Sequence, residues 1–369
     1  MNKYSVAIDL GTTTIELCII CNNEKNVVAS DSFKNRQALY GSDVINRIFA
    51  IERNYNNYDK LRQVVIEDIK HSVLKLCSNN KISIEDITKI VFSGNTTMNS
   101  ILLKKDVSSL GKHPFTNCLS ENVVLTEDII FNTFSCVKEI VFIKGASAFI
   151  GGDILSGLLY LSENNMLLNN SLLLDLGTNG EMILKHDDKF YATSASCGPA
   201  FEGAIRKQNA YGSNVIDAIS LGINARKISK EGILQEPFLD KGTEIMGIKL
   251  TASIIHDIIL AKAAIISGIE ILLNEAGVSR VDLMHIYIAG NFGLYLNLQS
   301  AYNIKMLPKE FEGKIKIIGN SSLEGAKIIC ESCDALKYIN DFSSEENFIV
   351  IQPSLKKHYE DILLKNMTF

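Results

Sequence analysis

One short phrase occurs twice in this chain, and each copy stands between apolar stretches that predict β-strands. Asp9-Leu-Gly-Thr12 follows the apolar residues 4–8, and Asp175-Leu-Gly-Thr178 follows residues 171–174, 166 positions later. A strand, a tight turn with glycine and a second strand form a hairpin. A polar turn and a third predicted strand follow each copy. A repeat of this size predicts two similar α/β lobes.

The rest of the pattern alternates strands with helices, as an α/β fold requires. Expected strands cover 87–92, 139–143, 284–288 and 315–318, and expected helices cover 98–103, 147–161, the stretch from Thr251 to Gly277 and residues after 319. Thr251 fits an N-cap and Gly277 a C-cap. No proline-rich or serine-rich linker stands out. We expect a boundary within 163–170 and two lobes, 1–166 and 167–369.

Composition excludes several classes of function. The chain has 37 basic and 42 acidic residues, a net charge of −5, which argues against nucleic-acid binding. Asp9 interrupts the apolar region that a signal peptide would need. The most apolar stretch, 254–273, contains Asp257, Lys262 and Glu270, so we expect a buried helix and no membrane partner. Eight scattered cysteines favour reduced thiols in a cytoplasmic protein.

The repeated turn suits phosphate binding. Glycine lets the backbone approach a ligand closely, and Thr12, Thr13 and Thr14 offer hydroxyl and N–H donors. A neighbouring carboxylate can hold a hydrated Mg²⁺ that neutralises phosphate charge. Two hairpins facing each other would hold a polyphosphate from both sides. The alternative, an ordinary hairpin turn, becomes weaker because the phrase is repeated and because a further glycine turn follows at 290–293.

The order of these motifs resembles the actin-like ATPase (ASKHA) superfamily, which includes sugar kinases, actin and heat-shock chaperone ATPases. Six further phrases, in order along residues 4–330, resemble the reductive activators of corrinoid enzymes. They are Tyr40-Gly-Ser-Asp-Val-Ile-Asn-Arg47, Gly94-Asn-Thr-Thr-Met98, Asp175-Leu-Gly-Thr-Asn-Gly-Glu181, Gly198-Pro-Ala-Phe-Glu-Gly203, Leu260-Ala-Lys-Ala-Ala-Ile265 and Ala289-Gly-Asn-Phe-Gly293. The resemblance implies an actin-like fold: two RNase H-like lobes of mixed sheets, flanked by helices, around a nucleotide cleft.

The resemblance also implies what individual residues do. Asp9 and Asp175 would serve a hydrated Mg²⁺, and Thr12, Thr13 and Thr178 would hold the phosphates of ATP. Gly290 would admit the adenosine, and Asn291 stands where these activators usually have a second glycine. The implied nucleotide-binding set is Gly11, Thr12, Thr13, Thr14, Gly177, Thr178, Asn179, Gly198, Ala200, Glu202, Gly290, Asn291 and Gly293.

Hydrolysis needs a group that orients the attacking water. Asp153, at the head of a predicted helix, and Glu181, just beyond the second turn, are the two candidates, and a purely structural carboxylate is the alternative for both. For Arg47 we expect an ion pair with Asp43, one helical turn away, rather than a phosphate contact.

The implied activity is ATP-dependent reduction of a corrinoid protein from Co(II) to Co(I). Activators of this type carry an iron–sulfur domain or cluster cysteines, but this sequence has no Cys-x₄-Cys-x₂-Cys run. Cys18 and Cys21 fall on opposite faces of a strand. Cys330 and Cys333 share a predicted helix face but supply two ligands, and a symmetric dimer would be needed for four. We therefore expect no cluster here and a separate ferredoxin-like electron donor.

Two other functions remain open from the sequence. One is a small-molecule kinase of the same superfamily, although the chain has no tryptophan to stack on a sugar ring. The other is a non-enzymatic, nucleotide-dependent switch or scaffold. Phosphorylation of a small acceptor would identify the kinase. Partner binding that survives loss of Asp9 and Asp175 would identify a scaffold that does not need nucleotide.

Overall fold

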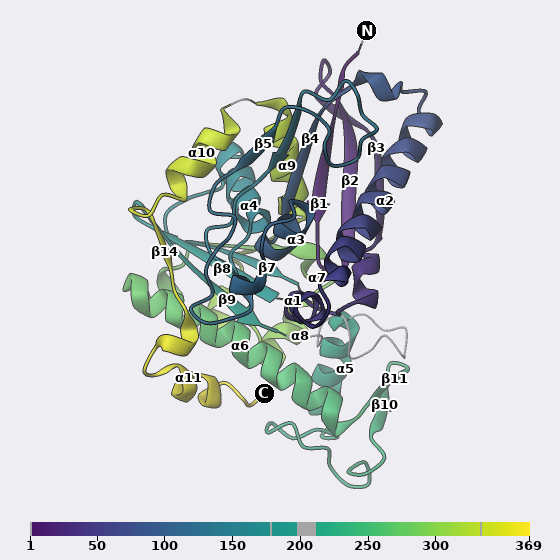
Figure 1. The fold of residues 1–369 in the computed structure, drawn as a ribbon. Coiled ribbons are helices and arrows are strands. Elements are labelled where there is room, and N and C mark those ends of the chain that lie inside the picture. The colour runs from purple at the N-terminus through teal and green to yellow at the C-terminus, as the bar shows by residue number, and fades with distance from the viewer. Residues whose placement is uncertain (1, 178, 198–211, 333) are drawn as a thin grey trace. The chain divides into compact units, whose positions relative to one another are not determined.

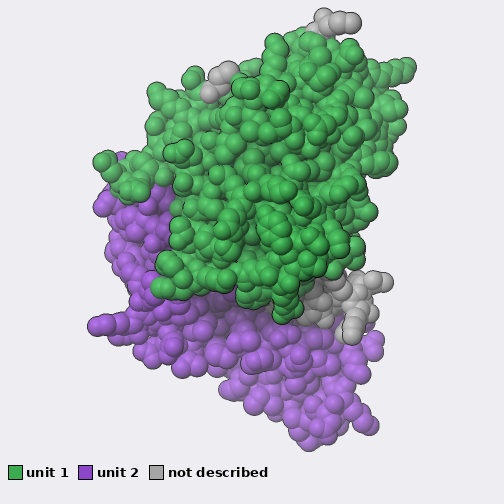
Figure 2. Space-filling model, in the orientation of Figure 1, with its two compact units in different colours: residues 1–167, 320–347 green, residues 168–319, 348–369 purple. Residues whose placement is uncertain are grey.

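The computed structural model describes residues 2–177, 179–197, 212–332 and 334–369, and the chain forms two compact units. Unit 1 consists of residues 1–167 and 320–347, and unit 2 consists of 168–319 and 348–369 (Figure 2). The chain therefore leaves unit 1, builds most of unit 2, and then returns. The predicted division into 1–166 and 167–369 did not include this return of 320–347.

Unit 1 is built on a mixed sheet with the strand order β3-β2-β1-β4-β6-β5. The first three strands form an antiparallel meander, and β4 and β6 run parallel to β1. The strands are β1 (Tyr4–Leu10), β2 (Thr14–Cys21), β3 (Asn26–Lys34), β4 (Ile87–Gly94), β5 (Val123–Leu125) and β6 (Glu139–Phe142). The central strands β1 and β4 are covered on both faces, which explains their nearly continuous apolar sequence.

Helices cover both faces of this sheet (Figure 1). The long helix α2 (Asn56–Asn79) packs on the face that carries Val6, Ile8 and Leu10. Helix α9 (Ser321–Glu331) lies against β1 and β4 beside α4 (Gly152–Glu163). Alternate residues of β1 point to opposite faces, so Asp9 belongs to the α9 face. The remaining helices are α1 (Val44–Arg53), α3 (Thr96–Leu102) and α10 (Ala335–Phe342).

Unit 2 repeats the plan of unit 1. Its sheet has the order β13-β12-β7-β8-β9-β14, so β9-β8-β7-β12-β13 corresponds to β3-β2-β1-β4-β6. Strands β7 to β9 form the meander, and β12 and β13 run parallel to β7. The strands are β7 (Ser171–Leu176), β8 (Asn179–His186), β9 (Lys189–Ser196), β12 (His285–Ala289), β13 (Ile315–Gly319) and β14 (Phe348–Val350). The predicted α/β fold with two similar lobes is confirmed.

The core helix of unit 2 is α6 (Ala252–Ala276), and both predicted caps are confirmed. Thr251 Oγ1 accepts from the N–H of Ile254, and Gly277 adopts the left-handed conformation at φ 70°. By length and composition alone α6 could cross a membrane, yet 67% of its most apolar stretch is buried in the structure. It packs on β8 and β9, which identifies it as a core helix.

Smaller elements complete the described part of unit 2. They are α5 (Gly212–Asn224), β10 (Thr243–Ile245), β11 (Ile248–Leu250), α7 (Gly290–Leu294), α8 (Leu298–Asn303) and α11 (Tyr359–Lys365). One expectation about unit 1 was wrong, because α4 begins at Gly152 rather than at Ser147. The Ser147 hydroxyl accepts from the N–H groups of Phe149 and Ile150, which forms a turn ahead of the helix.

Candidate functional site

The first Asp-Leu-Gly-Thr phrase forms the turn between β1 and β2, as predicted. The turn residues are Gly11, Thr12 and Thr13. A Cβ on Gly11 would lie 2.4 Å from the Thr14 carbonyl oxygen, so only glycine fits this turn. We call residues 9–14 the phosphate-1 hairpin.

All three carbonyl groups of this turn accept hydrogen bonds from other parts of unit 1. Asn35 donates from Nδ2 to Gly11 O at 2.9 Å and from its backbone N–H to Thr13 O at 2.8 Å. Arg47 donates from Nη2 to Thr12 O at 2.5 Å. In a trans peptide the C=O and the following N–H point in opposite directions. The N–H groups of Thr12 and Thr13 are therefore directed away from Asn35 and Arg47.

The predicted ion pair between Arg47 and Asp43 was wrong. Asp43 accepts from the N–H of Asn46 and caps α1, and no ion pair in the described ranges includes Arg47. The Arg47 side chain is fully buried and also donates to Gly41 O and to Gln37 Oε1. Burial lowers the pKa of Arg47 to about 10, so it stays charged at neutral pH. A buried cation thus lies directly behind the phosphate-1 hairpin.

Asp9 closes the hairpin next to the turn and is bound by the start of α9. Its Oδ1 accepts from Ser322 Oγ at 2.7 Å, and its Oδ2 accepts from Asn320 Nδ2 at 2.8 Å. The same Asn320 amide donates to Glu16, which pairs with Asp9 across β1 and β2. Burial, with a smaller effect of Glu16, raises the pKa of Asp9 to about 6, although Ser322 and Asn320 oppose this shift.

Asp153 lies in the first turn of α4, where a carboxylate favours the helix N-terminus. Its Oδ1 accepts from the N–H of Ile154 at 2.9 Å. A Cβ on Gly151 would approach both Asp153 Oδ1 and the Asn95 Cα at 2.5 Å. Gly151, next to Asp153 in the chain, is therefore packed closely against Asn95, which itself contacts the phosphate-1 hairpin through Thr12.

The second Asp-Leu-Gly-Thr phrase joins β7 and β8 in unit 2. Asp175 pairs with Glu181 across the two strands, as Asp9 pairs with Glu16 in unit 1. Directly opposite residues of a strand pair share one face of the sheet. Glu181 is only 7% exposed. Each hairpin therefore has an aspartate directly opposite a glutamate. The sequence repeat did not reveal this correspondence, because the two turns differ in length by one residue.

The predicted adenosine turn begins α7 immediately after β12. Gly290 has a φ of 85°, and a Cβ there would lie 2.7 Å from Asp175 Oδ1. Gly290 is thus required both by its backbone conformation and by its contact with the carboxylate. Gly293 packs its backbone on Ile288, so it serves the fold of the turn. Asn291 lies in α7.

The structure brings the predicted residues together in two groups. Asp9, Gly11, Thr12, Thr13, Thr14 and Asp153 lie in unit 1, and Asp175, Gly177, Asn179, Glu181, Gly290, Asn291 and Gly293 lie in unit 2. Four further predicted residues, Thr178, Gly198, Ala200 and Glu202, fall outside the described residues. The sequence motifs did not identify four further neighbours of the hairpin, because only folding brings them to it: Asn35, Asn95, Asn320 and Ser322.

The cysteines do not form a ligand set in the described part of the chain. Seven of the eight, all except Cys333, are described, and all seven are free thiols. Cys330 lies in α9, and the predicted pairing of Cys330 with Cys333 on one helix face cannot be described, because Cys333 lies outside the described residues. Among the described residues, no three His, Cys, Asp or Glu side chains come together as a metal site.

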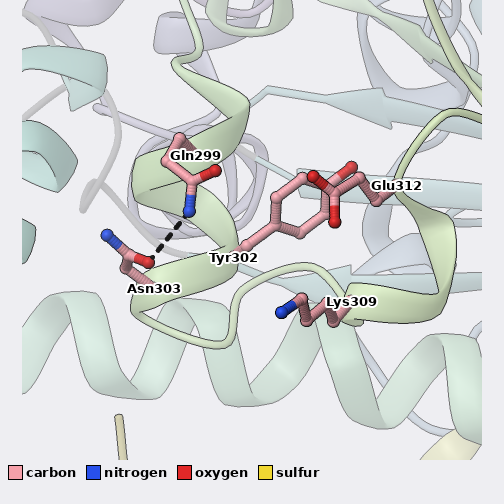
Figure 3. A pocket seen from close by; sticks show the side chains of 5 residues that line it. All are labelled: Gln299, Tyr302, Asn303, Lys309 and Glu312. Atoms are coloured by element: carbon pink, nitrogen blue, oxygen red, sulfur yellow. Dashed lines mark hydrogen bonds between the residues drawn. The ribbon is translucent and has the colours of Figure 1, made fainter.

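Two surface pockets lie in unit 2 and contain none of the predicted site residues. One is a polar pocket of about 160 Å³ lined by side chains of α8 and the loop after it (Figure 3). Its lining residues are Gln299, Tyr302, Asn303, Lys309 and Glu312. The other, about 320 Å³, lies beside the start of α6 near His256. The lining residues of these two pockets include no residue of either hairpin turn, so neither pocket defines the candidate site.

Two family descriptions match this chain and together cover nearly all of it. Residues 4–164 match the "RACo middle region". Residues 169–369 match the "C-terminal domain of RACo the ASKHA domain", with the match divided at residue 210. The chain belongs to the RACo family. The ASKHA description agrees with the repeated sheet order and the paired hairpins found in the two units.

Relatives of this RACo-family chain are named for corrinoid activation. It is 27% identical to the "Corrinoid activation enzyme RamQ" of Eubacterium limosum, over 88% of this chain and 64% of that protein. It is 24% identical to the "[Co(II) methylated amine-specific corrinoid protein] reductase" of Methanosarcina barkeri, over 88% of this chain and 69% of the other. The chain therefore spans about two thirds of these relatives.

A solved structure supports the same assignment. The "Reductive activator for corrinoid,iron-sulfur protein" superimposes on all of this RACo-family chain with a TM-score of 0.86 and 26% sequence identity. The chain covers 66% of that structure's length. The resemblance stated from sequence motifs is therefore confirmed at the level of family and fold.

Proposed function

We propose that this chain binds Mg-ATP at its two Asp-Leu-Gly-Thr hairpins, hydrolyses it, and thereby drives one-electron reduction of a corrinoid protein. One electron converts Co(II) to Co(I), and ATP and water give ADP and phosphate. The electron comes from the iron–sulfur group of a separate, ferredoxin-like donor. The proposed place of action is the cytoplasm, which suits the seven free thiols.

One observation carries the nucleotide part of the proposal. The phosphate-1 hairpin is held by donors to its carbonyl groups, and its N–H groups are directed away from those donors. Successive backbone N–H groups aimed to one side bind anions such as phosphate. The carboxylate of Asp9 beside the turn fits a hydrated Mg²⁺, which holds water and oxygen ligands. Asp175 and Gly290 offer the corresponding groups in unit 2.

Asp153 and Glu181 remain the two candidates for orienting the attacking water. Asp153 is placed by the first turn of α4, and Glu181 by the β7–β8 pair beside Asp175. Comparing Asp153→Asn with Glu181→Gln separates them. The variant of the residue that orients water should bind ATP normally but hydrolyse it at least about a hundredfold more slowly, within the usual range for a general base.

The corrinoid part is tested by mixing the protein with a Co(II) corrinoid protein of a methyltransferase system, Mg-ATP and a low-potential reductant. The expected result is Co(I) absorbance that appears only with ATP. Asp9→Ala and Asp175→Ala should abolish it, whereas Asp188→Asn, an exposed turn position, should not. No ATP-dependent Co(I) with any tested corrinoid protein and donor would refute the proposed activity.

A further inference from the structure

Three asparagines of unit 1 each cap a helix and also contact the phosphate-1 hairpin. Asn35, Asn95 and Asn320 are the N-cap residues of a 3₁₀ helix (Arg36–Leu39), of α3 and of α9. Each uses its side-chain oxygen to accept from a backbone N–H of its own helix. Each then directs its side-chain NH₂ group to the phosphate-1 hairpin.

The capping bonds fix which side-chain atom is oxygen and which is nitrogen. Asn95 Oδ1 accepts from the N–H of Met98 at 2.9 Å, which leaves Nδ2 to donate to Thr12 Oγ1 at 3.0 Å. Asn35 and Asn320 are fixed in the same way by Gln37 N–H and Leu323 N–H. Asparagine suits these positions because aspartate caps equally well but has no NH₂ group.

The contact with Asn95 determines how the Thr12 hydroxyl can act. A hydroxyl has one hydrogen to donate and lone pairs that accept. Because Asn95 Nδ2 can only donate, Thr12 Oγ1 accepts there and keeps its own hydrogen for another partner. The buried guanidinium of Arg47, which donates to Thr12 O, adds a positive charge behind the same residue.

We propose that Asn35, Asn95 and Asn320, together with Arg47, are positioning residues that make the phosphate-1 hairpin a donor surface for the phosphates of a nucleotide. This inference rests on the proposed nucleotide binding. Asn35 and Arg47 donate to the carbonyl oxygens of the turn, and Asn95 donates to the Thr12 hydroxyl oxygen. Asn320 donates to the Asp9 carboxylate beside the turn. The hydroxyl hydrogen and the N–H of Thr12 are then directed away from these protein donors, toward phosphate oxygens, which accept only.

The test is Asn95→Asp, which retains the cap of α3 but replaces the NH₂ donor with a carboxylate. Thr12 would then donate its hydroxyl hydrogen to residue 95 rather than to phosphate. Isothermal titration calorimetry should show Mg-ATP affinity reduced by about tenfold or more, the loss expected for one hydrogen bond to a charged group. Adenosine, which has no phosphate, should bind as it does to the wild type.

Asn297→Asp is the matched control. Asn297 is an exposed N-cap of α8 in unit 2, where it accepts from Gln299 and Ser300 N–H groups. The same chemical change there should leave Mg-ATP affinity unaltered. Asn95→Ser keeps a capping oxygen without adding charge and covers the case in which Asn95→Asp unfolds. In a Thr12→Val background, Asn95→Ser should have little further effect on affinity.

Wild-type affinity for Mg-ATP in both Asn95 variants would overturn the inference. So would an equal loss of ATP and adenosine binding, because that pattern indicates general damage to the fold. A wild-type chain that does not bind Mg-ATP at all would instead refute the proposed function. The two failures are thus told apart by the wild-type titration.

Discussion

Burial of Asp9 in the folded protein favours its neutral form, whereas the proposed Mg²⁺ binding needs the charged carboxylate. Burial and the neighbouring Glu16 favour its neutral form, while Ser322 and Asn320 donate to the carboxylate and favour the charged form. Burial outweighs the two donors, so the pKa of Asp9 rises to about 6. At neutral pH the carboxylate is therefore charged at some cost in folding free energy, and it is available to a hydrated cation.

This balance predicts a pH dependence of stability. The folded state binds the Asp9 proton more tightly than the unfolded state does. Protonation of Asp9 therefore stabilises the folded state below pH 4, and this stabilisation is lost as the pH rises through 6. Asp9→Asn should remove this loss. The free energy of unfolding of the variant, relative to wild type, should increase by about 1–2 kcal/mol between pH 4.5 and pH 7.5.

Urea unfolding at several pH values measures the effect. Asp188→Asn, at an exposed turn in unit 2, is the control and should follow the wild-type pH profile. Parallel profiles for Asp9→Asn and wild type would show that Asp9 does not carry the shifted proton.

Helix α9 joins the phosphate-1 hairpin to the rest of unit 1. Its first turn supplies Asn320 and Ser322 to Asp9, and Ser322 also hydrogen-bonds Ser93 of β4 at 2.7 Å. One turn further on, Gly325 packs against α4, where an added Cβ would lie 2.1 Å from the Ser156 carbonyl oxygen. The absence of a side chain at Gly325 therefore permits the close approach of α9 to α4.

Gly325→Ala should destabilise the protein, because the added Cβ would clash with the backbone of α4 at Ser156, which cannot move aside as a flexible side chain can. We expect a loss of about 2 kcal/mol in the free energy of unfolding, despite the better helix propensity of alanine. Gly268→Ala in α6 is the matched control, since its Cβ would meet the flexible end of Met182 at 2.9 Å. That variant should change stability by less than about 1 kcal/mol. Equal effects of the two substitutions would contradict the proposed role of Gly325.

The whole molecule is organised by a chain that crosses between its units three times. Residues 320–347 return to unit 1, where α9 lies against β1 and β4, and residues 348–369 return to unit 2, where β14 pairs with β9. Neither unit is therefore a single continuous segment. The last segment also contributes Phe369 to the core of unit 2.

Two truncations test this organisation. Ending the chain after Asn347 removes β14 and α11 and should reduce hydrogen-exchange protection in β8, β9 and α6 only. Ending it after Gly319 also removes α9 and should reduce protection in β1 and β4 as well. The described strands of unit 1 should thus respond to the second truncation and not to the first. Loss of protection in β1 and β4 after the first truncation would contradict the division into these two units.

Local sequence determined the elements that local physics controls. The turn at Gly11, the caps Thr251 and Gly277 and the repeated apolar strands were predictable because each depends on neighbours within a few residues. The family was recognisable for the same reason, since its motifs are short phrases in a fixed order. The α4 start was misplaced because the Ser147 turn competes with a helix over the same residues.

Tertiary structure alone decided what surrounds the phosphate-1 hairpin. Asn320 and Ser322 reach Asp9 from more than 300 residues away, and Arg47 turns inward to the Thr12 carbonyl instead of pairing with Asp43. No periodicity or spacing encodes such contacts, because they depend on how β1, α1 and α9 pack. The sequence thus determined that two Asp-Leu-Gly-Thr hairpins exist, and packing decided which donors surround the first of them.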